Sequence, residues 1–127
     1  MKKFFPPLIL SFLLYLSAGC NNSVTNPTTN NSVTFSVSQQ PGNLGIKFYA
    51  KPSADVKITK IISLLASASF TDTVVNQNPS YVFSKDTSYE INEYTGVQSG
   101  QKWNFNFIGN TVSNNTAFNV TTSYTVP

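Results

Sequence analysis

The side chains that most often carry catalysis or bind transition metals are rare in this sequence. Histidine and arginine do not occur in it, and its one cysteine is Cys20. Ser–His–Asp and Cys–His nucleophiles therefore cannot be assembled, and zinc, copper, haem and iron–sulfur sites lack ligands. A Ser–Lys pair, or Glu90 with Glu93 acting on a glycoside, would need a sizeable cleft that so small a domain rarely has. We predict that the protein is not an enzyme.

One group of oxygen-bearing side chains could suit a hard cation. Asp86, Glu90 and Glu93 lie within eight residues of one another, with Asn92 between the glutamates, and calcium prefers oxygen ligands. The spacing does not match an EF-hand loop, and the alternation of a strand would divide these residues between its two faces. We therefore predict no metal site, and calcium at this group stays an open alternative.

The first residues of the chain have the order of an export signal. Two lysines after Met1 precede an apolar stretch, Phe4–Leu16, and the small residues Ser17–Gly19 follow. This order indicates a secretory signal, because a helix that spans a membrane needs about 20 apolar residues. The ending Leu-Ser-Ala-Gly-Cys, residues 16–20, resembles the lipobox of bacterial lipoproteins. The resemblance implies that cleavage leaves Cys20 as a lipidated N-terminus. A covalent lipid on Cys20 is the only bound group we expect, and we predict no cofactor.

The same resemblance implies a place in the bacterial cell envelope, with the membrane as a partner through the lipid on Cys20. Asn21 follows the cysteine at the position where the enteric rule for inner-membrane retention requires aspartate. We therefore predict the outer membrane, with the protein in the periplasm or on the cell surface. The formal net charge is +3, and two of the lysines, Lys2 and Lys3, belong to the signal. Because the remaining excess is small and arginine is absent, we predict no nucleic-acid partner.

The rest of the chain divides into a polar tether and one domain. Residues 20–32 contain the cysteine and a stretch rich in Asn, Ser and Thr without periodicity, which predicts a disordered tether. From residue 33 to residue 127, apolar residues recur at every second position, and no stretch keeps a helical period. A short helix could lie only within Ile61–Ala68. The misplaced Lys60 indicates either a bulge near Thr59–Ile61 or a lysine that buries its stem and extends its amine to solvent. The predicted strands are Val33–Ser38, Gly45–Ala50, Val56–Leu64, Ser67–Val75, Tyr81–Ser84, Thr87–Tyr94, Lys102–Phe107 and Phe118–Val126.

About seven or eight short strands without crossover helices predict a single antiparallel β-sandwich. This architecture over residues 33–127 resembles immunoglobulin-like and fibronectin-type-III-like domains. The Cys–Trp–Cys hallmark of true immunoglobulin domains is absent. The sequence Trp-x-Phe-x-Phe-x-Gly from Trp103 onward, followed by Phe-x-Val and Ser-Tyr-Thr-Val, is similar to the last hairpin of such domains.

The last hairpin has the clearest alternation, and it predicts which side chains point outward. If Trp103, Phe105 and Phe107 point into the core together with Phe118 and Tyr124, the residues between them face solvent. We call these outward residues the hairpin face and predict that it contacts a partner, by strand addition or as a flat polar interface. The alternative is that it is a passive solvated face. The hairpin face consists of Lys102, Asn104, Asn106, Asn119, Thr121, Ser123 and Thr125.

Two functions from different classes fit these patterns. The first is a non-catalytic, envelope-anchored lipoprotein whose immunoglobulin-like domain serves adhesion or docks to an envelope protein. The alternative is a carbohydrate-binding lipoprotein of a glycan-uptake system, because amide and hydroxyl side chains can hydrogen-bond to sugars without charge. Strands and turns also favour Thr, Asn and Ser for reasons of backbone structure, so composition alone does not decide between the two.

Overall fold

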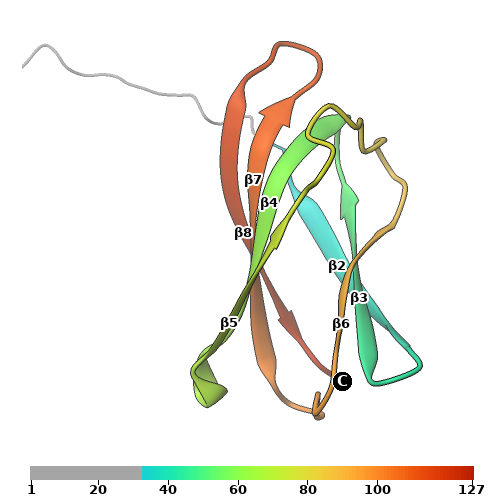
Figure 1. Ribbon diagram of the computed structural model, residues 1–127, viewed down its shortest axis with the longest axis vertical. Coiled ribbons are helices and arrows are strands. Elements are labelled where there is room, and N and C mark those ends of the chain that lie inside the picture. Colours follow the sequence, from blue (N-terminus) through green and yellow to red (C-terminus); the bar gives the residue numbers. More distant parts are fainter. Residues whose placement is uncertain (1–32) are drawn as a thin grey trace, which may run out of the picture. The chain divides into compact units, whose positions relative to one another are not determined.

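The computed structural model describes residues 33–127, which form an all-β domain (Figure 1). Within these residues, no helix has the length and apolarity needed to cross a membrane. The described elements are β2 (Phe35–Pro41), β3 (Ile46–Pro52), β4 (Val56–Leu65), the short 3-10 helix η3 (Ala66–Ala68), β5 (Phe70–Val75), β6 (Tyr89–Tyr94), β7 (Lys102–Thr111) and β8 (Ala117–Thr125).

The seven strands form two antiparallel sheets, which confirms the predicted all-β sandwich. One sheet has the strand order β2-β3-β6 and the other has the order β5-β4-β7-β8. Figure 1 shows the two sheets facing each other, with β5 and β6 on one side of the sandwich. In the constant-type immunoglobulin order the fourth strand pairs with the fifth. Here the fourth strand, β5, pairs with β4 and so joins the opposite sheet.

Aromatic side chains from both sheets fill the space between them. Phe48 on β3 and Phe105 and Phe107 on β7 are completely buried. Phe35 on β2 stacks on Phe107 with ring centroids 4.0 Å apart, and Phe48 lies 5.1 Å from the ring of Phe105. Trp103 is 2 % exposed, which confirms the prediction that it belongs to the core. Because each of these rings removes a large apolar area from water, they supply much of the stabilisation of the domain.

The predicted irregularity in β4 is present. The pairing of β4 with β7 shifts register between Ile58 and Lys60, as a bulge requires. Gly109 on β7 lies opposite this point, and a Cβ atom there would overlap the carbonyl oxygen of Lys57. The bulge therefore depends on a residue without a side chain at position 109.

Two local predictions were wrong. Tyr81–Ser84 is not a strand. The chain forms a turn in which the N–H of Tyr81 donates to the carbonyl of Asn78, and only Phe83 pairs with the sheet, in an isolated bridge to Val56. The segment predicted as a strand from residue 67 begins instead with η3, and Ser69 adopts a left-handed conformation with φ of 51°. That turn reverses the chain, so β5 starts at Phe70. The helix option within residues 61–68 is therefore limited to the one turn of η3.

Candidate functional site

The hairpin face lies where the alternation predicted it. Along β7 and β8 the positions that carry Trp103, Phe105, Phe107 and Phe118 are buried, and the intervening side chains point away from the core. The register sets Lys102 opposite Thr125 and continues in step along the hairpin. The seven predicted residues are thus brought together on one outer surface. Their role in binding remains a prediction.

Several polar side chains of the hairpin face bond to one another. The Asn106 side-chain amide donates hydrogen bonds to Asn119 Oδ1 at 2.6 Å and to Thr121 Oγ1 at 3.0 Å. One step along the hairpin, Ser123 Oγ donates to Asn104 Oδ1 at 2.5 Å. These cross-strand bonds hold the side chains in fixed positions. The hairpin face is therefore neutral apart from Lys102, and its side chains are ordered before any partner binds.

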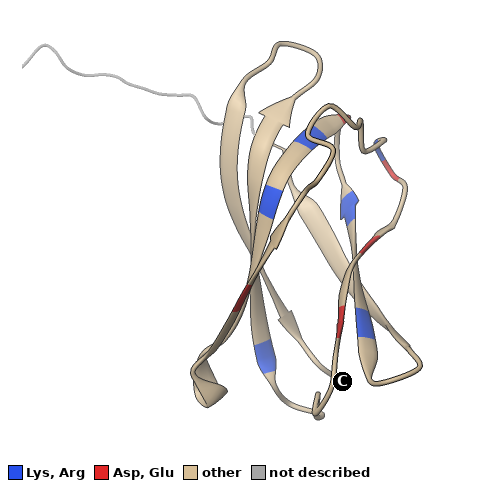
Figure 2. Cartoon of the chain, viewed as in Figure 1, with Lys and Arg blue, Asp and Glu red and all other residues tan. Residues whose placement is uncertain are grey.

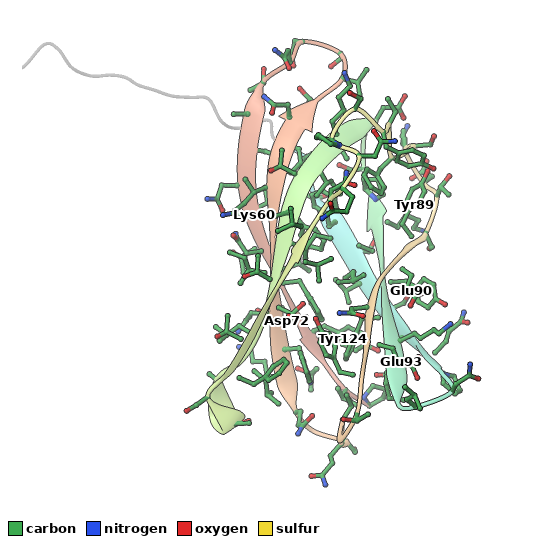
Figure 3. All side chains as sticks on the ribbon, in the orientation of Figure 1. Lys60, Asp72, Tyr89, Glu90, Glu93 and Tyr124 are labelled. Atoms are coloured by element: carbon green, nitrogen blue, oxygen red, sulfur yellow. The ribbon has the colours of Figure 1, made fainter. Side chains whose placement is uncertain are left out.

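The hairpin face contains no aromatic residue. The aromatic side chains of β7 and β8, Trp103 and Tyr124 among them, all belong to inward-facing positions. Figure 3 shows Tyr124 between the two sheets. A sugar ring could form hydrogen bonds to this surface but would find no aromatic plane to stack on.

The acidic residues considered for calcium are separated by the fold. Asp86 lies in the loop before β6, with its carboxylate 4.0 Å from Lys85 Nζ, and Glu90 lies 3.8 Å from Lys47 Nζ. Glu93 accepts hydrogen bonds from the backbone N–H groups of Leu44 and of Gly45, the latter at 2.7 Å. Across residues 33–127, no group of three metal-binding side chains is present. Glu93 instead fixes the turn between β2 and β3.

The structure also contains a polar contact that the sequence did not indicate. Asp72 on β5 points inward, and its Oδ2 atom accepts a hydrogen bond from the Tyr94 hydroxyl at 2.7 Å and one from Asn92 Nδ2 at 3.3 Å. Tyr94 and Asn92 belong to β6, so the contact joins the two sheets. Burial raises the pKa of the Tyr94 hydroxyl to about 12, and the Asp72 carboxylate acts in the same direction. We call the open side of the sandwich between β5 and β6 the seam.

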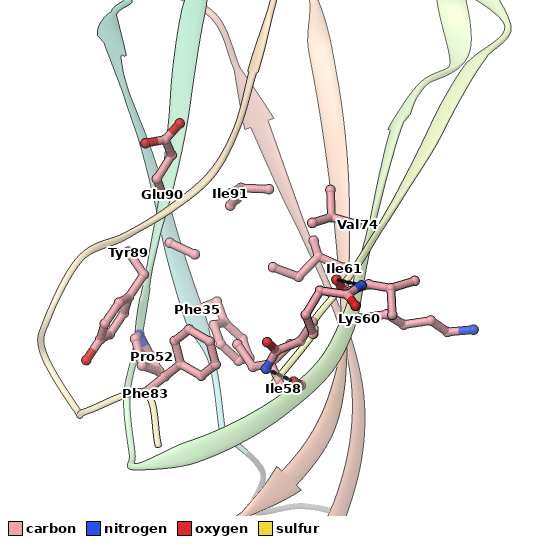
Figure 4. Close-up of a pocket in the computed structure, with 14 residues that line it drawn as sticks. Phe35, Pro52, Ile58, Lys60, Ile61, Val74, Phe83, Tyr89, Glu90 and Ile91 are labelled. Carbon is pink, nitrogen blue, oxygen red and sulfur yellow. Dashed lines mark hydrogen bonds between the residues drawn. The ribbon is translucent and has the colours of Figure 1, made fainter. Parts of the chain in front are cut away.

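Two cavities open into the seam, one on each side of this contact. The Tyr89 cavity has a volume of about 210 Å³, and Figure 4 shows it between β6, β4 and the end of β5. Its wall is mainly apolar, with Glu90, Lys60 and Asn76 at the edge, and it includes Phe35, Ile58, Val74, Phe83, Tyr89 and Ile91. The Trp103 cavity has a volume of about 220 Å³ and is lined by Leu65, Ala68, Phe70, Tyr94, Gln101 and Trp103.

One signal in the sequence could have revealed the seam. In Phe70–Val75, Asp72 shares its alternation with Phe70 and Val74, so a charged residue occupies an inward position of a short strand. Such a carboxylate needs a partner from another element. The identity of that partner depends on the packing of two sheets, which alternation within one strand does not report.

The predicted lipidation site, Cys20, lies outside the described residues, together with the predicted signal (1–19) and tether (20–32). Comparisons of the chain with protein-family models, curated proteins and solved structures find no match.

Proposed function

We propose that the protein is a non-catalytic lipoprotein of the bacterial envelope whose β-sandwich docks to an envelope protein through the hairpin face. The observation that supports docking is the set of cross-strand side-chain bonds around Asn106 and Asn104. Side chains that are already fixed lose little conformational freedom when a partner binds. A surface of this kind suits a flat, polar protein contact.

The outer edge of β8 adds to this proposal. Among the described strands β8 pairs with β7 alone, and the chain has no charged side chain after Lys102. Edge strands that must stay unpaired usually carry lysines that prevent strand addition. The β8 edge has none, so a partner strand could extend the interface beyond the hairpin face.

The glycan-binding alternative has less support at this surface. Sugar sites commonly combine polar side chains with an aromatic plane, and the hairpin face supplies only the first of these. A glycan array probed with the protein separates the two functions. Specific glycan binding that survives changes to the hairpin face would favour the alternative.

The test of docking is a double substitution on the hairpin face. Asn104→Lys with Thr121→Lys places two positive charges on the hairpin face and leaves the inward side chains unchanged. We expect cross-linking of the full-length protein to its envelope partner to be lost. Ser36→Lys with Ser38→Lys is a matched control, because both serines are exposed on β2 and the charge gain is the same. Unchanged cross-linking in a folded hairpin-face variant would contradict the proposal.

The test of the anchor is Cys20→Ser. If Cys20 carries the lipid, this variant should leave the membrane fraction and move from the detergent phase to the aqueous phase. A single acyl chain binds membranes only marginally and two or more bind firmly, so the expected change is nearly complete. A Cys20→Ser protein that stays with the detergent phase would contradict the lipoprotein assignment.

A further inference from the structure

The second edge of the larger sheet, β5, exposes more apolar surface than β8 does. Phe70 is 36 % exposed and Val75 is 57 % exposed, and Tyr81 and Val82, in the loop that follows, are exposed as well. The remaining residues of β5 include Thr71, Thr73 and Val74, and the strand has no lysine. An edge strand that is rich in β-branched residues and has exposed apolar side chains at both ends can readily pair with another strand.

The backbone of β5 has free groups on its outer side. Among the described strands it pairs with β4 alone, and the N–H of Asn76 donates to the carbonyl of Thr59 at 2.9 Å. In an antiparallel pair, bonded residues alternate with residues whose N–H and C=O groups face away. The bond of Asn76 fixes that alternation, so the backbone groups of Thr71, Thr73 and Val75 point to the free edge.

A strand added at this edge would place alternate side chains against the seam. Phe70 borders the Trp103 cavity and Val74 borders the Tyr89 cavity, and the contact of Asp72 with Tyr94 lies between them. Four residues along a strand span about 13 Å. Two apolar side chains of the added strand, four positions apart, would thus reach the two cavities, and the residue midway between them would lie over Asp72.

The charge at the seam determines which type of residue suits the middle position of the added strand, the one that lies over Asp72. The strands β5 and β6 have no lysine, and the red segments on them in Figure 2 mark their acidic residues. Glu90 lies 3.8 Å from Lys47 Nζ and Glu93 binds the turn between β2 and β3. The carboxylate that faces the seam is therefore that of Asp72. We propose that an extended segment of a partner protein adds to the free edge of β5. The three side chains of this segment that face the seam, at every second position, would be apolar, basic and apolar in that order.

A second copy of this chain fits the edge poorly. Its β5 has no basic side chain to offer, so both Asp72 carboxylates would stay without a positive partner in every register. In the register that sets Phe70 against Val74, the two carboxylates would lie directly opposite each other, and like charges at such positions are destabilising. The charge pattern therefore favours a different protein as the occupant.

The test uses the full-length protein in detergent and a labelled peptide, Thr-Leu-Thr-Lys-Thr-Leu-Thr, whose pattern is the same in both strand directions. A matched peptide has Glu in place of Lys. We expect measurable binding by fluorescence anisotropy for the lysine peptide and roughly tenfold weaker binding for the glutamate peptide. Asp72→Asn should reduce that difference, because the neutral amide keeps the shape and removes the charge.

Thr73→Pro tests the strand pairing itself. Proline removes the outward N–H at position 73 but leaves the bonds to β4 in place, since proline is tolerated in an edge strand on its solvent side. We expect roughly tenfold weaker binding of the lysine peptide, whereas Thr73→Ala, which keeps the N–H, should bind as the original chain does. Circular dichroism and thermal melting check that both variants fold.

Three results would overturn the proposal. The first is equal affinity for the two peptides, the second is equal binding by Thr73→Pro and Thr73→Ala, and the third is a dimer in sedimentation that Thr73→Pro dissociates. The last result would assign the edge to a second copy. The hairpin-face variant Asn104→Lys with Thr121→Lys should bind the peptide normally, so failure here and failure of the docking function are distinguishable.

Discussion

The hairpin of β7 and β8 and the seam between β5 and β6 are both sheet margins, but they are stabilised in different ways. The hairpin joins strands that are neighbours in sequence, and the half-buried Asn106 bonds to side chains of the strand beside it. The seam joins edge strands of different sheets, and one side-chain contact, Asp72 to Tyr94, bridges them between two cavities. Pairing of neighbouring strands thus joins the side chains of the hairpin to one another, whereas the packing of the two sheets leaves two cavities at the seam.

The largest expected effect is at the residue that belongs to both regions. Trp103 lies on β7 and lines the seam, with its ring 5.2 Å from that of Tyr94 and 5.8 Å from that of Phe70. Trp103→Ala should lower the free energy of unfolding by roughly 3–5 kcal/mol, measured by urea denaturation. Phe70→Ala, at a more exposed ring, should lose less. A loss below about 1 kcal/mol for Trp103→Ala would contradict its place in the core.

The next effect concerns the hairpin where β7 pairs with β4, away from the seam. Gly109→Ala places a Cβ atom against the carbonyl of Lys57 and 2.9 Å from the Cα of Ile58. Because both obstacles are backbone at the β4 bulge, we expect the stability to fall by about 1–3 kcal/mol. Asn110→Ala, at the next position and on the outward side, is the control, with an expected change within about 0.5 kcal/mol. Equal stability of the two variants would show that the bulge adjusts freely.

A smaller effect tests the bridge across the seam. Tyr94→Phe removes the hydroxyl that donates to Asp72, and we expect a loss of roughly 1–2 kcal/mol at neutral pH. The raised pKa of Tyr94, about 12 in the folded state against 10.0, also gives a pH dependence. Its stabilising contribution is complete below pH 10.0 and is lost as the pH rises towards 12, because the unfolded chain releases the proton first. Unfolding measured between these pH values should show a shallower decline for Tyr94→Phe, and parallel declines would contradict the contact.

The smallest effect is expected on the hairpin face. Asn106→Ala removes the bonds to the side chains of Asn119 and Thr121 and a longer one, at 3.4 Å, to the carbonyl of Val120. Water can replace these contacts at the surface. We expect a loss of about 0.5–1 kcal/mol, again by urea denaturation. If Asn106→Ala destabilises the domain more than Tyr94→Phe does, the ranking of the two regions is reversed, and the hairpin face would be a structural element as much as a binding surface.

The hairpin was predicted well because the pattern that determines it lies within each of its strands. Alternation from Trp103 to Phe107 determines which side of β7 is buried, and the bulge was visible as the displaced Lys60. The error at Tyr81–Ser84 has a physical cause: apolar residues also occur where a loop covers the core, as Phe83 does by its single bridge to Val56. Alternation over four residues does not distinguish these cases.

The seam could not be predicted in the same way. Asp72 and Tyr94 are 22 positions apart, in strands that pair with different neighbours, and their contact depends on which sheet β5 joins. That choice is made by the pairing of β5 with β4 after η3. A sequence pattern gives the two faces of each strand, but it does not give the order of strands in the sheets.

The contact between the first and last described strands affects how the domain folds. Thr122 Oγ1 donates to the carbonyl of Phe35 at 3.2 Å across 87 positions, and the ring of Phe35 lies 5.7 Å from that of Phe118. Closing so long a loop costs chain entropy before any contact compensates for it, which makes folding slow. The N-terminal strand cannot complete its burial until β8 has emerged. A chain that emerges with its N-terminus first therefore cannot complete its fold until its last strand is available.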